Sequence, residues 1–275
     1  MTPPLVLKLG GELLEEPSRM SAVVAAVNEM AALSPLAIVH GGGKEIDAAL
    51  RTAGIEKRQI DGLRVTDAAT LDIVVAVLAG AVNTRLVAAL TTAGVRAVGL
   101  TGADGACGLS ETAPPHRMAD GRAVDLGRVG LPIEEADMHV LRALLEERFV
   151  PVVASIGVDR DGRLLNVNAD VMAGHLAARL RARRLVIAGS TPGVLDDGGA
   201  TVPLLDPAAI ARLVAGGTAT AGMIAKLRAC EQALRNGVDD VVIVDGRDRE
   251  ALRDAASGGV PPSATRIVTT VGTRS

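Results

Sequence analysis

Residues 5–11 read Leu-Val-Leu-Lys-Leu-Gly-Gly, a short apolar run that carries one lysine and ends in two glycines. Runs of this length, bounded by glycine or proline, are typical of strands buried on both faces of a parallel sheet. Similar runs recur at 36–39, 95–100, 151–156, 185–188 and 241–244. Segments with helical spacing lie between them, at 19–33, 67–92, 134–147, 170–180 and 222–236. This alternation predicts an α/β fold with a mainly parallel central sheet between helices.

Residues 105–130 interrupt this alternation of strands and helices. They are expected to form hairpins or a lid beside the sheet.

Composition narrows the class of protein. The chain has 275 residues, 48% of them apolar, and a net charge of −3, so it can bury a large core and lacks the basic balance of nucleic-acid-binding proteins. Phe149 is the single aromatic residue, so base-stacking platforms are absent. The sequence shows no signal-peptide pattern and no uninterrupted apolar run of about 18 residues. These features predict a cytoplasmic protein that binds neither nucleic acid nor membrane, with Cys107 and Cys230 as reduced thiols.

Glycine-rich turns follow the first two predicted strands. Lys8 precedes Gly10 and Gly11, and residues 39–43 read Val-His-Gly-Gly-Gly before a predicted helix. Glycines there let backbone N–H groups approach an anion, and a helix N-terminus adds the positive end of its dipole. Both turns are candidate phosphate or carboxylate sites, and both also fit as plain tight turns. The spacing of a Walker P-loop is missing. His40 is expected to be packed or hydrogen-bonded rather than catalytic.

Three further segments carry candidate polar groups. Arg64, in the segment Gly-Leu-Arg-Val-Thr, could clamp a carboxylate with its guanidinium fork, although a lone arginine is usually a solvated charge. In the segment Asn-Val-Asn-Ala-Asp at 166–170, Asn168 or Asp170 could cap the following helix. The alternative is that Asn166 bonds a substrate and Asp170 orients neighbouring cationic groups.

Lysine is rare in this chain. Of 29 basic residues only four are lysines, at positions 8, 44, 57 and 226. A chain that otherwise uses arginine is expected to keep lysine where a compact, flexible ammonium group is needed. Lys8 and Lys226 are therefore candidates for neutralising phosphate charge.

In this order and spacing the motifs resemble the acetylglutamate kinases of the amino acid kinase family. The matching segments span nearly the whole chain and read KLGG, VHGGG, GLRVT, VLAGAVNTRL, PVVASIGV, LNVNAD and GMIAK. The resemblance implies a three-layer αβα sandwich. It also implies an N-terminal lobe over residues 1–182 for the acyl amino acid and dimerisation, and a C-terminal lobe over 183–275 for ATP.

Residue roles follow from the same resemblance. Lys8 and Lys226 would stabilise the transferred phosphoryl group, with Asp170 holding both lysines in place. The substrate would be bound by Gly42, Gly43, Arg64 and Asn166. ATP would carry Mg²⁺ through its phosphates, without a separate metal site in the protein. The nucleotide would lie against Gly10, Gly11, Ser190, Thr191, Pro192, Gly193, Val194, Leu195, Thr218, Ala219 and Thr220.

The implied reaction is ATP-dependent phosphorylation of the side-chain carboxylate of N-acetyl-L-glutamate, giving N-acetylglutamyl 5-phosphate for arginine biosynthesis. Such a carboxylate has an ordinary pKa of about 4.3 and is ionised at pH 7, so no general base is required. Positioning and charge neutralisation should dominate. The acyl group, acetyl or succinyl, stays open.

Two other functions remain open. A related kinase acts on aminoadipate or glutamate attached to a small acidic carrier protein, which would favour a basic docking surface. The arginines at 179, 181, 183 and 184 form such a cluster in sequence, although a solvated, arginine-rich helix end explains them more simply. A non-catalytic amino-acid sensor could share the fold, but retention of Lys8, Asp170 and Lys226 favours an enzyme.

Two departures from the family pattern bear on binding and assembly. Ser190 stands where the family commonly has aspartate, which predicts an altered contact near the nucleotide. Four residues precede Leu5, whereas arginine-inhibited members carry an extra N-terminal helix there. An arginine-insensitive homodimer is therefore expected, with the helix at 67–92 at its interface.

Overall fold

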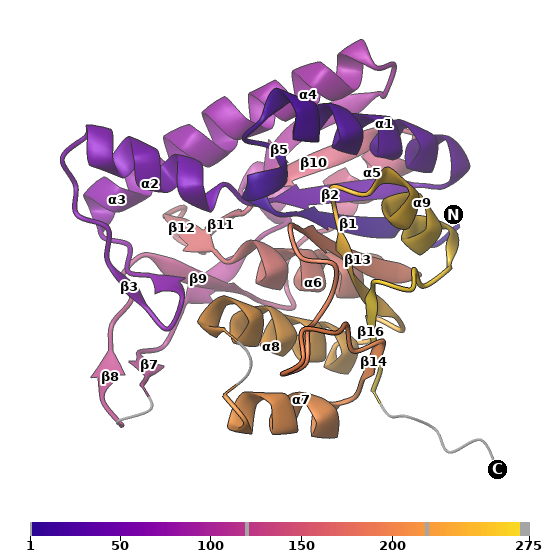
Figure 1. Ribbon diagram of the computed structural model, residues 1–275. Helices are drawn as coiled ribbons and strands as arrows, with labels where there is room; N and C mark the ends of the chain where they lie inside the picture. The colour runs from indigo at the N-terminus through magenta and orange to yellow at the C-terminus, as the bar shows by residue number, and fades with distance from the viewer. Residues whose placement is uncertain (1, 119–120, 218–219, 270–275) are drawn as a thin grey trace.

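The structure is a computed structural model that describes residues 2–118, 121–217 and 220–269. Within these residues the centre is an eight-stranded sheet with the order β14-β16-β15-β13-β1-β2-β10-β5 (Figure 1). Its paired strands run parallel except for β15 and β16, which are antiparallel. The bounds are β1 (Leu5–Leu9), β2 (Leu36–His40), β5 (Ala97–Thr101), β10 (Val150–Ala154), β13 (Arg184–Gly189), β14 (Leu204–Leu205), β15 (Val241–Asp245) and β16 (Thr265–Ile267).

Helices cover both faces of this sheet, as Figure 1 shows. One buried cluster joins the sheet to α1, α2, α4 and α9, and a second joins it to α5, α6, α7 and α8. The three-layer αβα sandwich predicted from the sequence is confirmed. The bounds are α1 (Pro17–Leu33), α2 (Gly43–Thr52), α3 (Ala68–Val75), α4 (Asn83–Thr92), α5 (His139–Glu146), α6 (Ala169–Leu180), α7 (Pro207–Ala215), α8 (Ala221–Arg235) and α9 (Arg249–Ser257).

Strand β1 lies in the middle of the sheet and is buried on both faces. Its side chains alternate between the two clusters: Leu5, Leu7 and Leu9 face the layer of α1, whereas Val6 faces the layer of α6. Lys8 has the same parity as Val6, so its side chain points towards α6 and α8. The period of a strand therefore decides which helices can supply partners for this lysine.

A second, four-stranded sheet of described residues, in the order β11-β12-β9-β6, lies beside the large one. The single strand predicted at 151–156 is wrong, because the chain leaves the large sheet after Ala154. Ser155 then accepts a hydrogen bond from the amide of Val167, and the next strand pairs with β12 instead of with β2. The bounds are β6 (Ser110–Thr112), β9 (Val129–Pro132), β11 (Ile156–Val158) and β12 (Leu164–Val167).

Two short hairpins project from this region. Strands β3 (Gln59–Ile60) and β4 (Leu63–Arg64) are joined by Asp61 and Gly62, which both have positive φ and form a tight two-residue turn. Strands β7 (His116–Arg117) and β8 (Ala123–Val124) pair between β6 and β9, which pair antiparallel themselves. The hairpins predicted for residues 105–130 are therefore confirmed.

The helix predicted at 67–92 is confirmed as one continuous run through α3, the π-helical segment η2 (Ala76–Val82) and α4. Asp67 caps its start by accepting a hydrogen bond from the amide of Thr70. The run is long and apolar enough to cross a membrane by length and composition. It packs here against the sheet, through Leu78, Val82, Leu86 and other buried residues, while much of its outer surface stays uncovered.

Helix α5 begins later than the sequence predicts. Residues 134–138 form turns instead of the first part of a helix at 134–147. The amide of Ala136 donates to the carbonyl of Ile133, and the carboxylate of Asp137 accepts from the amide of His139. A side chain that competes for helical N–H groups in this way favours a start after itself.

The proposed lobe boundary at residue 182 falls just before β13. Because β13 pairs with β1, the large sheet runs across this boundary without interruption. The division into residues 1–182 and 183–275 stays a prediction.

Arg184, at the start of β13, is buried and anchors the end of α9. Its guanidinium bonds the carboxylate of Asp240 and the carbonyls of Ala255, Gly258 and Gly259. Arg183 also turns inward in part, donating to the carbonyl of Ala256 and to Ser34 Oγ. The basic cluster expected at 179–184 is therefore wrong as a surface feature for Arg184, since burial and internal hydrogen bonds occupy that side chain.

Truncating this arginine should destabilise the fold. In Arg184→Ala, Asp240 loses a buried partner and three carbonyls lose a donor, so we expect the free energy of unfolding to fall by about 3–5 kcal/mol. Urea unfolding followed by circular dichroism measures the change. The matched control is Arg253→Ala, which removes an exposed arginine of α9. Equal unfolding midpoints for both variants would contradict the structural role of Arg184.

Candidate active site at the carboxyl ends of the strands

A buried cluster of three charges is the centre of the candidate site. The carboxylate oxygen Oδ1 of Asp170 lies 2.9 Å from Lys8 Nζ and 3.5 Å from Lys226 Nζ. The three side chains are only 9%, 11% and 15% exposed for Lys8, Asp170 and Lys226 respectively. They come from β1, α6 and α8, so the fold brings together the three residues that the sequence singles out as catalytic.

The cluster shifts the pKa values of its members in different directions. Burial lowers the pKa of Lys8, but the adjacent Asp170 carboxylate outweighs burial and leaves that pKa raised. For Lys226, burial and the positive charge of Lys8 together lower the pKa below the ordinary value. Burial opposes ionisation of Asp170, yet the two lysines lower its pKa and keep the carboxylate charged. The site therefore holds two ammonium groups around one carboxylate.

Helix caps fix the position of this carboxylate. Asn168 caps α6, because its side-chain oxygen accepts from the amides of Asp170 and Val171 at 2.9 and 3.2 Å. Of the alternatives for this segment, Asn168 takes the capping role and Asp170 orients the lysines. At the start of α8, Thr220 caps by accepting from the amide of Met223. The predicted nucleotide residues Thr218 and Ala219 lie outside the described residues.

The two glycine turns meet beside the cluster. A Cβ built on Gly11 would lie 2.6 Å from the Cα of Gly42, so the turns pack backbone against backbone. A Cβ on Gly42 would lie 2.8 Å from the side chain of Leu78 in the π-helical segment. Glycine is required at these two positions because neighbouring atoms leave no space for a side chain. The amides of Gly10 and Gly41 donate to the carbonyls of Ala188 and Leu9, so the amides of Gly11, Gly42 and Gly43 are the candidate donors to an anion.

His40 holds the second turn in place. Asn83 Nδ2 donates both to the carbonyl of Val152, at 2.8 Å, and to His40 Nε2, at 3.0 Å. His40 Nε2 is then an acceptor, which assigns the proton to Nδ1, and Nδ1 donates to the carbonyl of Gly41 at 3.2 Å. Burial lowers the pKa of His40 to about 4, so the ring is neutral at pH 7. It is packed and hydrogen-bonded, as the sequence predicts.

Arg64 and Asn166 are linked through one buried threonine. Asn166 Nδ2 donates to Thr66 Oγ1 at 3.0 Å, and that hydroxyl donates to the carbonyl of Arg64 at 3.1 Å. The Arg64 nitrogen Nη2 bonds Asp47 and also reaches the carbonyl of Gly43 at 3.4 Å. A second guanidinium nitrogen, Nη1, is buried and has no partner among the described residues. A buried unpaired donor of this kind suits a ligand carboxylate.

The predicted nucleotide segment at 190–195 is partly turned inward. The Val194 side chain is buried and its amide donates to Thr265 Oγ1 at 2.8 Å, while Thr191 and Leu195 are exposed. The amide of Ser190 donates to Glu12 Oε1 at 3.1 Å. Only part of this segment is therefore open to a ligand.

The β3–β4 hairpin reaches across the site. A Cβ built on Gly62, at its tip, would lie 3.6 Å from the backbone of Ala221 and Gly222 at the start of α8. The helix that carries Lys226 thus touches the hairpin that ends in Arg64. The hairpin places the candidate substrate residues and the candidate phosphate residues around one space.

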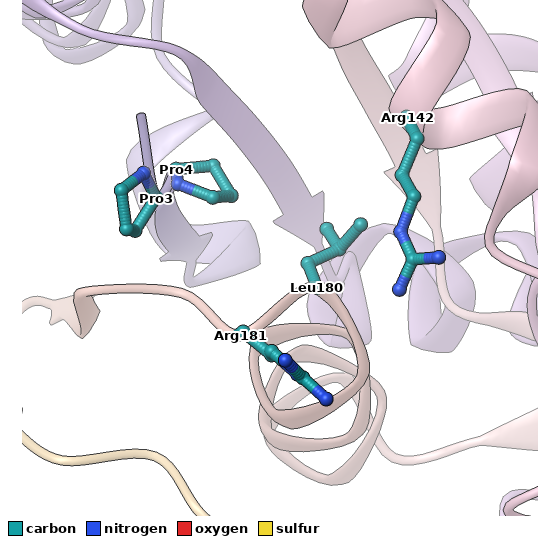
Figure 2. Close-up of a pocket in the computed structure, with 5 residues that line it drawn as sticks. All are labelled: Pro3, Pro4, Arg142, Leu180 and Arg181. Carbon is teal, nitrogen blue, oxygen red and sulfur yellow. The ribbon is translucent and has the colours of Figure 1, made fainter. Parts of the chain in front are cut away.

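A separate hollow of about 460 Å³ lies at the amino ends of the strands, on the opposite side from the candidate site. It is lined by Pro3, Pro4, Arg142, Leu180 and Arg181 (Figure 2). These residues precede β1 or lie on α5 and at the end of α6. The hollow is therefore distant from the carboxyl ends of the parallel strands, where ligands of such folds bind.

Sequence reasoning missed several polar residues of the site. Asp47 bonds both Arg64 and Lys57, Asn83 bonds His40, and Glu12 bonds the Ser190 amide. Asp47 and Asn83 each lie within a helix whose pattern reads as ordinary amphipathic or apolar sequence. Glu12 follows the first glycine turn directly, and that position alone could have drawn attention to it.

Comparisons with known proteins agree with this geometry. Residues 3–245 match the amino acid kinase family. An acetylglutamate kinase of Rhodopseudomonas palustris is 40% identical over 256 residues, covering 90% of this chain and 85% of that protein. The structure of smu.665 from Streptococcus mutans aligns with a TM-score of 0.81 and 27% identity, over 98% and 100% of the two chains. A carbamate kinase from Giardia lamblia shares the fold, with a TM-score of 0.68 at 14% identity over 98% and 99%.

The matched region contains both glycine turns, Arg64, Asn166 and the Lys8–Asp170–Lys226 cluster. The sequence match, the parallel sheet between two helical layers and the position of the charged cluster all lead to one assignment: this chain belongs to the amino acid kinase family.

Proposed function

We propose that this protein uses ATP to phosphorylate the side-chain carboxylate of N-acetyl-L-glutamate, giving N-acetylglutamyl 5-phosphate for arginine biosynthesis. Relatives at about 40% identity over nine-tenths of the chain are named acetylglutamate kinases. The single observation that carries the mechanism is the pairing of Lys8 and Lys226 with one carboxylate of Asp170. It concentrates two ammonium groups where two anions must meet.

The chemistry needs charge neutralisation more than proton transfer. A carboxylate oxygen of the substrate attacks the γ-phosphorus, the bond from that phosphorus to the β–γ bridging oxygen breaks, and ADP leaves with the bond's electron pair. No proton moves, because the attacking carboxylate is already ionised. Lys8 and Lys226 stabilise the charge on the transferred phosphoryl group, and Asp170 keeps them oriented. The glycine turns supply backbone N–H donors to the same group.

Arg64 and Asn166 supply the substrate side of the site. The unpaired Nη1 of Arg64 offers a buried, charged donor for the α-carboxylate. Asn166 is held by Thr66 through its Nδ2, which leaves its carbonyl oxygen to accept from an amide N–H such as that of an N-acyl group. Gly42 and Gly43 line the same space through their backbone.

The residues present also fit a nucleotide phosphate chain. Gly10 and Gly11 follow β1, and a Cβ at these positions would meet the Glu12 carboxylate and the Gly42 backbone respectively. No described group of three or more His, Cys, Asp or Glu residues could hold a metal ion by itself. Mg²⁺ is therefore expected to arrive with ATP, where it supplies additional neutralisation of phosphate charge.

The protein is further proposed to act in the cytoplasm as a homodimer. The outward face of the helical run from Ala68 to Thr92 is incompletely covered and carries mostly small residues, such as Ala76, Gly80 and Ala88. A second copy of the chain would bury this face. Light scattering coupled to size-exclusion chromatography measures the assembly.

Internal use of two arginines weakens the carrier-protein alternative. Arg184 is buried against Asp240, and Arg183 donates to Ala256 and Ser34, so half of the proposed docking cluster is engaged inside the protein.

An ATP-dependent hydroxamate assay distinguishes the free substrate from the carrier-bound substrate, because hydroxylamine traps the acyl phosphate that either would form. We expect turnover with free N-acetylglutamate above that with N-succinylglutamate, N-acetylaspartate, aminoadipate or carrier-bound substrate. Turnover with carrier-bound substrate alone would overturn the proposal.

Removing Lys226 should abolish most turnover while leaving the fold intact. For Lys226→Ala we expect kcat to fall by about 10²–10³-fold, the cost of losing one charge-stabilising donor. The matched control is Lys44→Ala, because Lys44 follows the second glycine turn but has a side chain that is 72% exposed. Steady-state kinetics and thermal melting are measured together. Near-parent kcat in Lys226→Ala would remove Lys226 from the mechanism.

The value of kcat/KM should begin to fall at a pH below the ordinary pKa of a lysine. Because burial and Lys8 lower the pKa of Lys226 below 10.5, the free enzyme loses this positive charge as the pH rises through the lowered value. We expect kcat/KM to fall with pH in that range, below pH 10.5. In Lys226→Arg the guanidinium stays protonated, so the decline should move to higher pH even if the maximal rate is smaller. An identical alkaline limb in both proteins would contradict this assignment.

A further inference from the structure

Glu12 is an acidic side chain of the site that the mechanism above does not use. It lies in the 3₁₀ turn η1 (Gly11–Leu13), directly after the first glycine turn. A Cβ built on Gly10 would lie 2.5 Å from both carboxylate oxygens, and one built on Gly189 would lie 3.3 Å from Oε1. The carboxylate therefore rests on glycine backbone between the ends of β1 and β13.

Two sets of contacts tie this carboxylate to the phosphate side of the site. Its Oε1 accepts the amide hydrogen of Ser190 at 3.1 Å. Burial is the largest effect on the pKa of Lys8 and of Lys226 and lowers both, and the charge of Glu12 acts in the opposite direction as a smaller addition to that of Asp170. Glu12 thus occupies the same electrostatic environment as the lysines that are to meet the nucleotide.

The backbone around Glu12 is firmly held. The amides of Leu13 and Leu14 donate to the carbonyls of Gly10 and Gly11, and Arg19 Nη1 donates to the carbonyl of Glu12. Gly11 and Leu13, on either side, are buried. Only rotation of the side chain can move the carboxylate, so it stays within reach of the glycine turn.

The position of the Glu12 carboxylate is electrostatically unfavourable for binding a polyanion. Glu12 and Asp170 together cancel the formal charge of Lys8 and Lys226, and Glu12 takes a backbone N–H that a phosphate could otherwise use. A carboxylate and a phosphate oxygen repel each other at short range unless a cation lies between them. Mg²⁺ is commonly held by one or two protein carboxylates together with nucleotide phosphates.

We propose that Glu12 is the protein carboxylate that holds the divalent cation accompanying the nucleotide. This inference rests on the proposed use of ATP, and it assigns a ligand to the chain itself in place of a cation held by phosphates alone. The ligand class is a hard divalent cation, Mg²⁺ or Mn²⁺, bridged to phosphate oxygens. In this arrangement the charge of Glu12 favours the metal–nucleotide complex and disfavours the free nucleotide.

The test compares ATP binding with and without metal, by isothermal titration calorimetry without acceptor substrate. Glu12→Gln keeps a side-chain oxygen for the Ser190 amide and removes only the charge. In EDTA we expect the variant to bind ATP about three- to tenfold more tightly than the parent, because one repulsive charge is gone. In excess MgCl₂ we expect the order to reverse, because the stimulation of ATP binding by Mg²⁺ falls by more than the gain seen in EDTA, by up to about 100-fold.

The control is Glu16→Gln, which makes the same charge change four residues away on a side chain that is 56% exposed. It should leave both affinities within about twofold of the parent, because exposed charges are screened. Equal changes with and without Mg²⁺ in Glu12→Gln, or none in either condition, would overturn the role of Glu12. A parent protein that binds no ATP in either condition would instead overturn the proposed function.

Discussion

The carboxylate of Asp170 between two lysines is the interaction on which the site depends. A buried lysine without a partner would tend to lose its proton, and two adjacent buried lysines would repel each other. The carboxylate of Asp170, at 2.9 and 3.5 Å from the two ammonium groups, offsets this repulsion and favours the charged form of both lysines. Because Lys8, Asp170 and Lys226 come from β1, α6 and α8, the same interaction also ties the central strand to two helices of one layer. The charge arrangement and the packing of that layer therefore constrain each other.

Around this cluster, the groups that could position an anion are mainly backbone N–H groups and preformed side-chain donors. Contact between Gly11 and Gly42 joins two turns that are separated by a whole helix in sequence. His40, kept neutral by burial, adds no charge and serves to hold the carbonyl of Gly41. Arg64 is held by Asp47 at Nη2, and its Nη1 has no partner among the described residues. Such preorganisation suits a reaction in which positioning and charge neutralisation supply most of the rate enhancement.

Much of this arrangement could be predicted from the sequence, and the exceptions have physical reasons. Apolar runs bounded by glycine predict buried parallel strands well, and the order of the glycine, arginine, asparagine and lysine motifs predicts which residues meet. The run at 151–156 misleads because hydrophobicity is continuous across Ser155, whereas the backbone changes sheets there. Glu12 and Asp47 escape notice because an acidic residue in a turn or helix is ordinarily solvated. Only three-dimensional proximity, to Ser190 and to Arg64, distinguishes them.

The central position of β1 has a consequence for how the chain reaches its native state. Its neighbours are β2, which follows within 40 residues, and β13, which begins at Arg184. During synthesis from the N-terminus, β1 can pair on one side early, but its other edge must wait for most of the polypeptide to emerge. An unpaired apolar edge is a template for association with other chains. Strand β1, which carries Lys8, thus keeps one apolar edge unpaired until β13 has been synthesised.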